Sequence, residues 1–188
     1  MIENTKLLGT IVQTDLKWDL NTANIVKKAN MRMELLRKSA SFGASHQDLK
    51  DIYIIFIRSL LEQSATVWHS SLTDQNKSDL ERVQKCAVKV ILKEEYRGYK
   101  SALARLDLLS LDERREQLCL SFALKCTKHN KHKNMFPLNQ KSHNMQTRFT
   151  EKYKVQHAHT ERLKSSSIIY MQHLLNEHEV QNIGHIET

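Results

Sequence analysis

The 188-residue sequence contains only one proline and four glycines. This scarcity of chain-breaking residues argues against a turn-rich all-β fold and favours long helices. The sequence also has no uncharged stretch of about 20 mostly apolar residues, so it predicts no membrane span and no membrane partner. The first residues, MIENTKLLG, lack the basic and apolar regions of a secretory signal, and we expect none.

Cysteine is scarce and odd in number, with Cys86, Cys119 and Cys126 inside helical patterns. Cys119 and Cys126 would lie about 10 Å apart along one helix, too far for a disulfide bond. Reduced thiols are typical of intracellular proteins. The sequence therefore predicts an intracellular protein, without distinguishing nucleus from cytoplasm.

Patterns that carry catalysis are absent from the sequence. It has no glycine-rich phosphate loop, no nucleophile elbow and no His-Glu-x-x-His zinc helix. The adjacent acidic pairs at 94–95 and 112–113 would point to different faces of a helix, so neither forms a two-carboxylate site. We therefore expect no catalytic residues and no cofactor.

One spacing could suit a metal ion, because Cys126, His129 and His132 lie three residues apart and His143 could be a fourth ligand. Structural zinc sites usually pair their ligands in two separate knuckles, which this spacing does not match. Eight of the ten histidines lie after residue 128, so such a spacing also arises by chance. The sequence therefore predicts no metal site.

The most apolar stretch is Leu49 to Trp68, LKDIYIIFIRSLLEQSATVW. Its apolar residues surround nearly the whole circumference of a helix, and such a helix is buried on several sides. An acid and a base one turn apart can pair within that apolar surround. The predicted core residues of this central helix are Phe56, Arg58, Leu61, Glu62 and Trp68.

The other elements are predicted from periodicity and from end signals. We expect a strand over 6–13, helices over 22–41, 73–93 and 100–106, and a helix that opens with the capping pair Ser110 and Glu113. That last helix would bury Leu111, Leu118, Cys119, Phe122 and Cys126. Gly43 would end the first helix, and Thr73 or Asp74 would begin the helix over 73–93. The inner face of the first helix would be Ile25, Val26, Ala29, Met33, Leu36 and Ala40. Periodicity is lost from 128 to 146, and a short helix follows residue 166. The predicted fold is mainly all-α, a helical bundle with one short N-terminal strand and a basic, partly irregular C-terminal segment.

The net charge of +8 is unevenly placed. Residues 125–164 hold ten Lys or Arg and two acids, whereas the remaining residues hold nineteen of each sign. Such a segment is typical either of an anion-facing surface, most often for nucleic acid, or of a solubilising loop. Its candidate contact residues are Lys125, Lys128, Lys131 and Lys133.

A second set of cations lies on the helix predicted over 73–93. Arg82, Lys85, Lys89 and Lys93 fall within about 80° of one another at the helical period. This stripe is either an ordinary solvated face or a surface that contacts phosphates, and charge alone does not decide between them.

A longer ordered pattern accompanies these features. In sequence order, KLLGTIVQTDLKW, IYIIFIRSLLEQSATVWH, LERVQKCAVKVIL, YKSALARLDLLSLDERREQLCLSFALKC, MFPLN and TERLKSSSIIYMQHLLNE occur between about residues 6 and 178. Together these blocks resemble the C-terminal part of reverse transcriptases from animal non-LTR, jockey-like retrotransposons. An ordered series of blocks is far more specific than a single motif.

The resemblance implies a fold and a role. In that family the strand containing Leu-Gly ends the palm, and the helices after it form a thumb that lies against the template–primer duplex. The implied domains are 1–20 from the palm end, 21–127 as a helical thumb-like domain, and 128–188 as a basic loop with a short helix. The implied partners are an RNA–DNA or DNA duplex and the rest of a palm where one is present, and Arg114 and Arg115 join the candidate phosphate contacts.

The resemblance also bears on catalysis. Polymerisation in that family uses two metal ions held by aspartates of an Ala-Asp-Asp type motif upstream of the Leu-Gly strand. This sequence contains no adjacent Asp-Asp pair. We therefore expect a non-catalytic, thumb-like fragment that binds duplex through its phosphate backbone. The alternative is a helical protein-interaction module whose basic segment meets an acidic partner.

Overall fold

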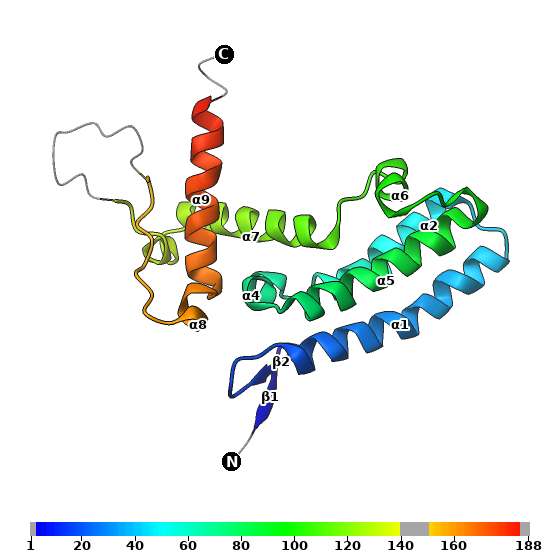
Figure 1. The fold of residues 1–188 in the computed structure, drawn as a ribbon, viewed down its shortest axis with the longest axis horizontal. Coiled ribbons are helices and arrows are strands. Elements are labelled where there is room, and N and C mark those ends of the chain that lie inside the picture. Colours follow the sequence, from blue (N-terminus) through cyan, green and yellow to red (C-terminus); the bar gives the residue numbers. More distant parts are fainter. Residues whose placement is uncertain (1–2, 140–150, 185–188) are drawn as a thin grey trace. The chain divides into compact units, whose positions relative to one another are not determined.

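The computed structural model of the chain describes residues 3–139 and 151–184, with side chains described as far as residue 181 (Figure 1). The predicted mainly helical class is confirmed. The chain divides into two compact units, each described here by itself. Unit 1 contains Met1–Trp68 and Leu72–Arg115, and unit 2 contains His69–Ser71 and Glu116–Thr188.

The predicted single strand is instead a two-stranded antiparallel hairpin, β1 (Asn4–Leu7) and β2 (Thr10–Gln13). Leu8 and Gly9 form its two-residue turn, with φ of 48° and 89°. Two positive φ angles are what a tight hairpin turn requires, and glycine adopts them without steric cost. A glycine in the middle of an apolar run therefore marked a turn, which the single-strand prediction missed.

Helix α1 (Asp19–Ser41) has the predicted inner face, with Ile25, Ala29, Met33, Leu36 and Ala40 buried. Its end is also as predicted, because Gly43 has φ 83°. The N–H groups of Gly43 and Ala44 donate to the carbonyls of Ala40 and Ser39, which satisfies two otherwise unpaired groups at the helix end.

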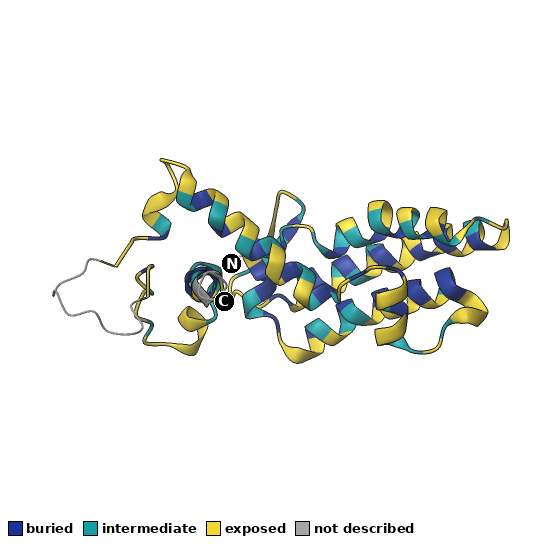
Figure 2. Ribbon diagram, turned by 90° about the horizontal axis from the view of Figure 1, so that it is seen from above, coloured by how far each residue is buried: buried dark blue, intermediate teal, exposed yellow. Residues whose placement is uncertain are grey.

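The predicted central helix is broken into α2 (His46–Ile52), the π-helix η1 (Tyr53–Arg58), α3 (Ser59–Leu61) and α4 (Ala65–Trp68). One stripe is buried, namely Leu49, Tyr53, Ile57, Leu61, Ala65 and Trp68. Ile55 is 61% exposed and Phe56 is 43% exposed, so burial on several sides and a core role for Phe56 were wrong. Helix α1 packs against α2, η1 and α3, and α5 packs against α2, and periodicity could not reveal which side these helices cover. Figure 2 shows buried and exposed residues alternating along the same helices.

Helices α1 and α5 (Asp74–Leu92) run parallel within unit 1. Asn76 Nδ2 donates to Asp19 Oδ1 at 2.8 Å near both starts, and Lys93 Nζ donates to the Ala40 carbonyl at 2.9 Å near both ends. Thr73 caps α5 through its hydroxyl, which accepts from the Asn76 N–H at 3.2 Å. The turn η3 (Lys93–Glu95) and α6 (Tyr99–Arg105) follow.

Helix α7 (Leu111–Lys128) begins in unit 1 and continues in unit 2. The predicted capping box is present: the Ser110 N–H donates to Glu113 Oε2 at 3.0 Å, and the Glu113 N–H donates to the Ser110 hydroxyl at 3.3 Å. Cys119 and Cys126 are buried as expected, whereas Phe122 is 41% exposed and was wrongly placed in the core.

Unit 2 combines most of α7 with η2 (His69–Ser71), η4 (Lys133–Met135), α8 (Glu161–Lys164) and α9 (Ser167–Gly184). The irregular segments that flank residues 140–150 meet at an antiparallel bridge between Leu138 and Tyr153. Helix α9 is longer than the short helix predicted for this region. The possible fourth zinc ligand, His143, lies outside the described residues.

The two-unit division differs from the predicted domains. The hairpin belongs with the unit 1 helices, and Asn21 of α1 accepts the Ile11 N–H of β2 at 3.0 Å. The second boundary falls at Arg115–Glu116, inside a helix, rather than after residue 127. In the part of the chain that the structure describes, every helix is too short or too polar to cross a membrane.

Candidate nucleic-acid interface

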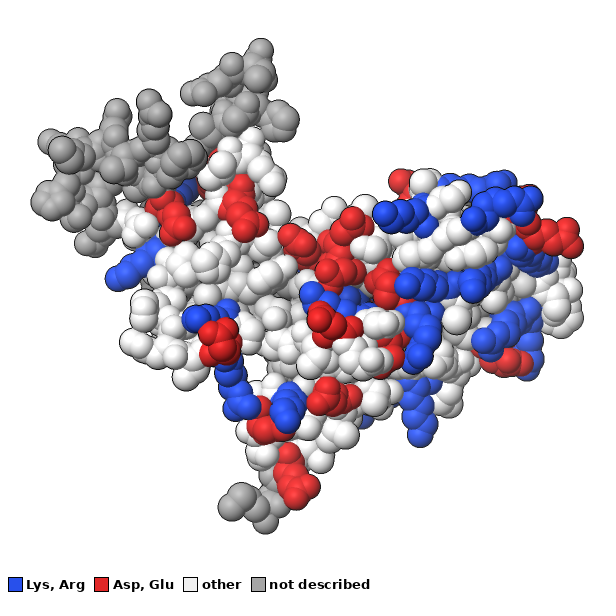
Figure 3. All heavy atoms as spheres, in the orientation of Figure 1, with Lys and Arg blue, Asp and Glu red and all other residues white. Residues whose placement is uncertain are grey.

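Beyond its first turn, α5 exposes cations and no acids. From Ser78 onward, its exposed residues are Ser78, Arg82, Lys85, Cys86 and Lys89. Ordinary solvated surfaces intersperse both signs of charge. We call Arg82, Lys85 and Lys89 the α5 cation face; Figure 3 shows Lys and Arg gathered over the part of unit 1 that contains α5 and α6.

Both carboxylates of the same stretch of α5 are engaged inside unit 1. Asp79 Oδ1 accepts from Arg82 at 2.7 Å, and Arg82 remains largely exposed at its outer edge. Glu81 accepts from the Tyr99 hydroxyl and from the Leu111 N–H at 3.1 Å. Glu81 is therefore bonded at the start of α7 and does not pair with a lysine. The ammonium groups of Lys85 and Lys89 have no carboxylate partner among the described residues.

Those two lysines lie over tyrosine rings that come from the segment after α5. Lys85 Nζ is 5.2 Å from the centre of the Tyr99 ring, and Lys89 Nζ is 5.5 Å from the centre of the Tyr96 ring. Both distances lie within the range of cation–π attraction. Both rings also pack against the unit 1 core. Each ring therefore restricts a flexible lysine side chain that remains accessible to solvent. The two lysines are about one helical turn apart on α5.

A buried hydrogen-bond network holds Tyr99 on the side of the ring hydroxyl. Gln84 is fully buried, and its Nε2 donates to the Tyr99 hydroxyl at 2.8 Å and to the Leu109 carbonyl at 2.9 Å. The Tyr53 hydroxyl donates to Gln84 Oε1. Burial raises the pKa of Tyr53, and burial together with the Glu81 carboxylate raises the pKa of Tyr99. The tyrosine beneath Lys85 is therefore neutral and held in place.

The fourth cation of the predicted stripe has a different place. Lys93 follows α5 with φ 48°, and its Nζ donates to the Ala40 carbonyl at 2.9 Å. A cation at the C-terminus of α1 interacts favourably with the negative end of the helix dipole. Lys93 is therefore engaged in holding α1 to α5, and the contact surface predicted from four cations is reduced to three.

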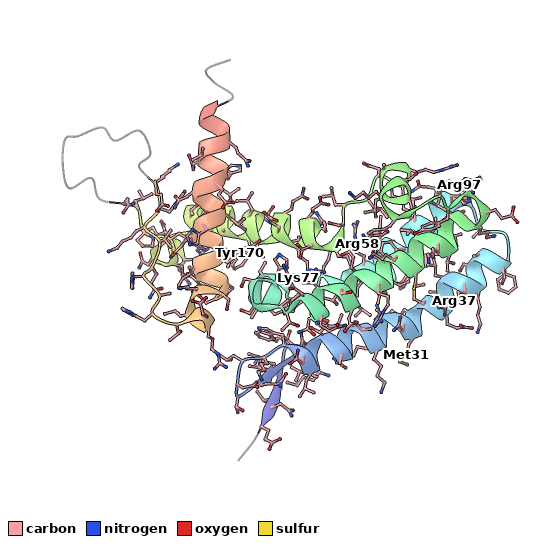
Figure 4. All side chains as sticks on the ribbon, in the orientation of Figure 1. Met31, Arg37, Arg58, Lys77, Arg97 and Tyr170 are labelled. Carbon is pink, nitrogen blue, oxygen red and sulfur yellow. The ribbon has the colours of Figure 1, made fainter. Side chains whose placement is uncertain are left out.

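The predicted pair Arg114 and Arg115 does not form an exposed contact surface. Arg115 is fully buried, its guanidinium 5.9 Å from the Trp68 ring and 3.5 Å from Asp112, so its proposed phosphate contact was wrong. Burial lowers its pKa, and the Asp112 carboxylate opposes that change. Arg114 Nε bonds Glu62 Oε1 at 3.1 Å, beside the predicted Arg58–Glu62 pair at 3.3 Å. Arg58 and Arg114 thus neutralise Glu62, and Figure 4 labels Arg58.

The cations predicted in unit 2 are exposed and lack this organisation. Lys125 and Lys128 lie on the last turns of α7, and Lys131 and Lys133 lie in the turns that follow it. None of the four has an acidic or aromatic partner among the described residues. They remain a rival contact surface defined by charge alone.

Charge patterning did not predict the two tyrosines that lie beneath the lysines of the α5 cation face. Tyr96 and Tyr99 occur in Y-R-G-Y-K, where aromatic residues alternate with Arg97 and Lys100. Aromatic residues interleaved with basic ones are typical of surfaces that bind single-stranded nucleic acid. That pattern was available in the sequence, but the lysines that lie over the rings belong to α5, seven and fourteen residues earlier in the chain.

The described residues contain no group of three His, Cys, Asp or Glu side chains that could hold a metal ion. His129 and His132 lie with ring centres 4.9 Å apart without a third ligand of that kind nearby. Comparison with known protein families, with curated proteins and with solved structures found no match to this chain.

Proposed function

We propose that this chain is a non-catalytic, thumb-like element that binds RNA–DNA or DNA duplex through the phosphate backbone, with the α5 cation face as its main contact. One observation carries the proposal. Beyond its first turn, α5 has three cations on one face and no exposed acid. Cations that contact phosphates bind every sequence alike and position a protein on duplex without reading bases.

The resemblance to the thumb region of non-LTR reverse transcriptases supports the same role, because LERVQKCAVKVIL contains all three cations of the face. Arg82 keeps one carboxylate partner, so it contributes less than Lys85 and Lys89. A single helical face supplies few phosphate contacts, which favours weak binding without sequence preference.

Salt dependence of duplex binding tests the proposal. Affinity for a blunt duplex is measured by fluorescence anisotropy over a series of salt concentrations, for the wild type and for R82A/K85A/K89A. Each lost phosphate contact reduces the slope of log affinity against log salt by about 0.9, so the triple variant loses up to about 2.7. The matched control, K125A/K128A/K131A, removes the same charge from unit 2 and is expected to keep the slope.

An α5 variant with an unchanged slope would contradict the proposal. A unit 2 variant that accounts for the whole effect would transfer the contact to the basic segment.

Cys86 offers a second, local readout. It is exposed on the α5 cation face, whereas Cys119 and Cys126 are buried. Alkylation of the native chain is therefore expected to have one fast phase, and C86S is expected to remove it. Duplex is expected to slow that phase, and equal rates with and without saturating duplex would place the contact elsewhere.

A second candidate function is supported by apolar residues on the outside of unit 1. Met31 and Leu35 lie one turn apart on α1, 69% and 45% exposed, and Phe42 at its end is 88% exposed. Figure 4 shows Met31 pointing outward from α1. These residues suit a protein partner. The variant M31E/L35E is expected to leave duplex binding intact, whereas loss of a protein partner with intact α5 lysines would favour the interaction module.

A further inference from the structure

The two lysine–tyrosine pairs have a geometry that duplex binding alone does not use. Tyr96 and Tyr99 each pack against the unit 1 core, and each carries a lysine over its ring. Lys85 and Lys89 are one turn apart on α5, about 6 Å along the helix axis. Phosphate contacts require the ammonium groups but do not require aromatic rings beneath them.

We propose that Tyr96 and Tyr99 form a stacking site for unpaired bases of single-stranded nucleic acid, with Lys89 and Lys85 binding the adjoining phosphates. The site rests on the proposed function, because it uses the same lysines, but it adds a ligand that a closed duplex cannot supply. Bases inside a duplex are stacked on one another, so only an unpaired nucleotide offers a free face to a tyrosine ring.

Replacing the lysine over each ring by a stacked base is favourable on general physical grounds. A lysine over a partly exposed ring contributes less than a base stacked on the same ring. The four-carbon stem of lysine is flexible, so the ammonium group can move from the ring to a phosphate without movement of the helix. The free protein therefore covers its rings with the groups that bind the backbone once a base is present.

The support beneath the rings is suited to this task. The Tyr99 hydroxyl donates to Glu81, and Gln84 donates to that hydroxyl, so the ring cannot rotate freely. The Tyr96 hydroxyl forms no hydrogen bond with a described residue, so its ring is held by packing alone. Arg97 and Lys100 alternate with the two tyrosines and are exposed, which adds positive charge around the rings.

The test compares a single-stranded oligonucleotide that has its bases with one of equal length and charge that carries abasic positions. Because the two strands present the same phosphates, any difference in affinity reports the bases. The wild type is expected to bind the strand with bases about tenfold more tightly for each ring engaged. Tyr96→Phe keeps a ring and is expected to keep the preference, whereas Tyr96→Leu is expected to lower it by about tenfold.

The same measurement is made with Tyr99→Leu and Tyr99→Phe. Tyr99→Phe loses the hydroxyl and keeps the ring. Blunt-duplex affinity is expected to stay within about twofold in all four variants, since the lysines remain. Equal wild-type affinity for the two strands overturns the stacking site while leaving salt-dependent duplex binding, and so the proposed function, in place. Loss of preference in Tyr96→Phe would equally overturn it, because that variant keeps the ring and removes no hydrogen bond to a described residue.

Discussion

The two units hold their chain segments in different ways. Among the described residues, the unit 1 core contains 23 buried apolar side chains, and the unit 2 core contains 8. Unit 2 adds two buried amides on α9: Asn176 accepts from the Tyr153 N–H at 2.9 Å and donates to its carbonyl at 3.0 Å. Gln172 likewise accepts from the Gln156 N–H at 2.9 Å and donates to the Met135 carbonyl at 3.0 Å.

This difference separates two ways of ordering a chain. Unit 1 mainly buries apolar stripes of regular helices, which the hydrophobic effect stabilises, and its buried Gln84 amide bonds chiefly other side chains. Unit 2 orders irregular segments that cannot satisfy their own backbone groups, and α9 supplies those hydrogen bonds from its side chains. We therefore expect unit 1 to be sensitive to lost volume and unit 2 to be sensitive to lost amides.

The largest expected effect is the loss of Trp68. Its side chain is fully buried, its Nε1 donates to the Gln63 carbonyl at 3.0 Å, and Arg115 lies over its ring. Trp68→Ala is expected to lower the free energy of unfolding by about 3–5 kcal/mol. Both tryptophans belong to unit 1, so the remaining Trp18 still reports its urea unfolding by fluorescence.

The matched control for this variant is Phe56→Ala. Phe56 lies in the same stretch of the chain but is 43% exposed, so its loss is expected to cost no more than about 1 kcal/mol. Equal shifts in the urea midpoint for the two variants would contradict the one-sided burial of this segment.

The second effect tests unit 2 through Asn176. Removing its amide leaves the N–H and the carbonyl of buried Tyr153 without their partner, at about 2–4 kcal/mol. Cys119 and Cys126 are both buried in unit 2, so their reactivity in a C86S background reports its opening. Asn176→Ala is expected to expose these thiols at lower urea, and exposed Gln181→Ala is expected not to. Unchanged thiol protection in Asn176→Ala would remove the contrast between the units.

The comparison also shows what the sequence could predict. Stripes repeated every three or four residues identified α1 and α5, and local end signals identified Thr73, Gly43 and Ser110. These features depend on neighbours in the chain. The partners of Gln172 and Asn176 lie between 16 and 37 residues away in segments without a period, so no local pattern revealed them.

The candidate site divides along the same line. The cations of the α5 face were predictable because one helix determines their direction. The burial of Arg115 and the exposure of Phe56 depend on which other helices cover a side, and charge or hydropathy does not contain that information. The lysine–tyrosine pairs join residues from α5 and from the segment after it, so they emerged only from the fold.

A smaller effect concerns pH and unit 1. The pKa of Tyr99 is raised above its ordinary value near 10, so the folded chain holds this proton more tightly than the unfolded chain does. The contribution is fully present below about pH 10 and is lost as pH rises further. Tyr99→Phe is expected to cost about 1–2 kcal/mol at neutral pH and to make the loss of stability above pH 10 less steep.

Tyr53→Phe provides the parallel measurement, because burial raises the pKa of Tyr53 in the same direction. Urea unfolding followed by tryptophan fluorescence at several alkaline pH values gives, for each variant, the slope of the free energy of unfolding against pH. An alkaline slope that is identical in the wild type and both variants would show that these hydroxyls do not titrate with unfolding.

The smallest expected effect concerns the cations of both units. Lys85 and Lys89 on α5, and Lys125 and Lys128 on α7, are exposed, and none bonds a carboxylate among the described residues. Each alanine replacement is expected to change the free energy of unfolding by less than about 0.5 kcal/mol, with K85A and K89A losing slightly more because their cation–π pairs are lost. Tryptophan fluorescence measures the unit 1 variants, and thiol exposure in the C86S background measures the unit 2 variants. Changes this small are what allow the same replacements to report nucleic-acid binding without unfolding. A loss of several kcal/mol from K85A or K89A would show that these lysines stabilise the fold, and their position on one face would then need no ligand to explain it.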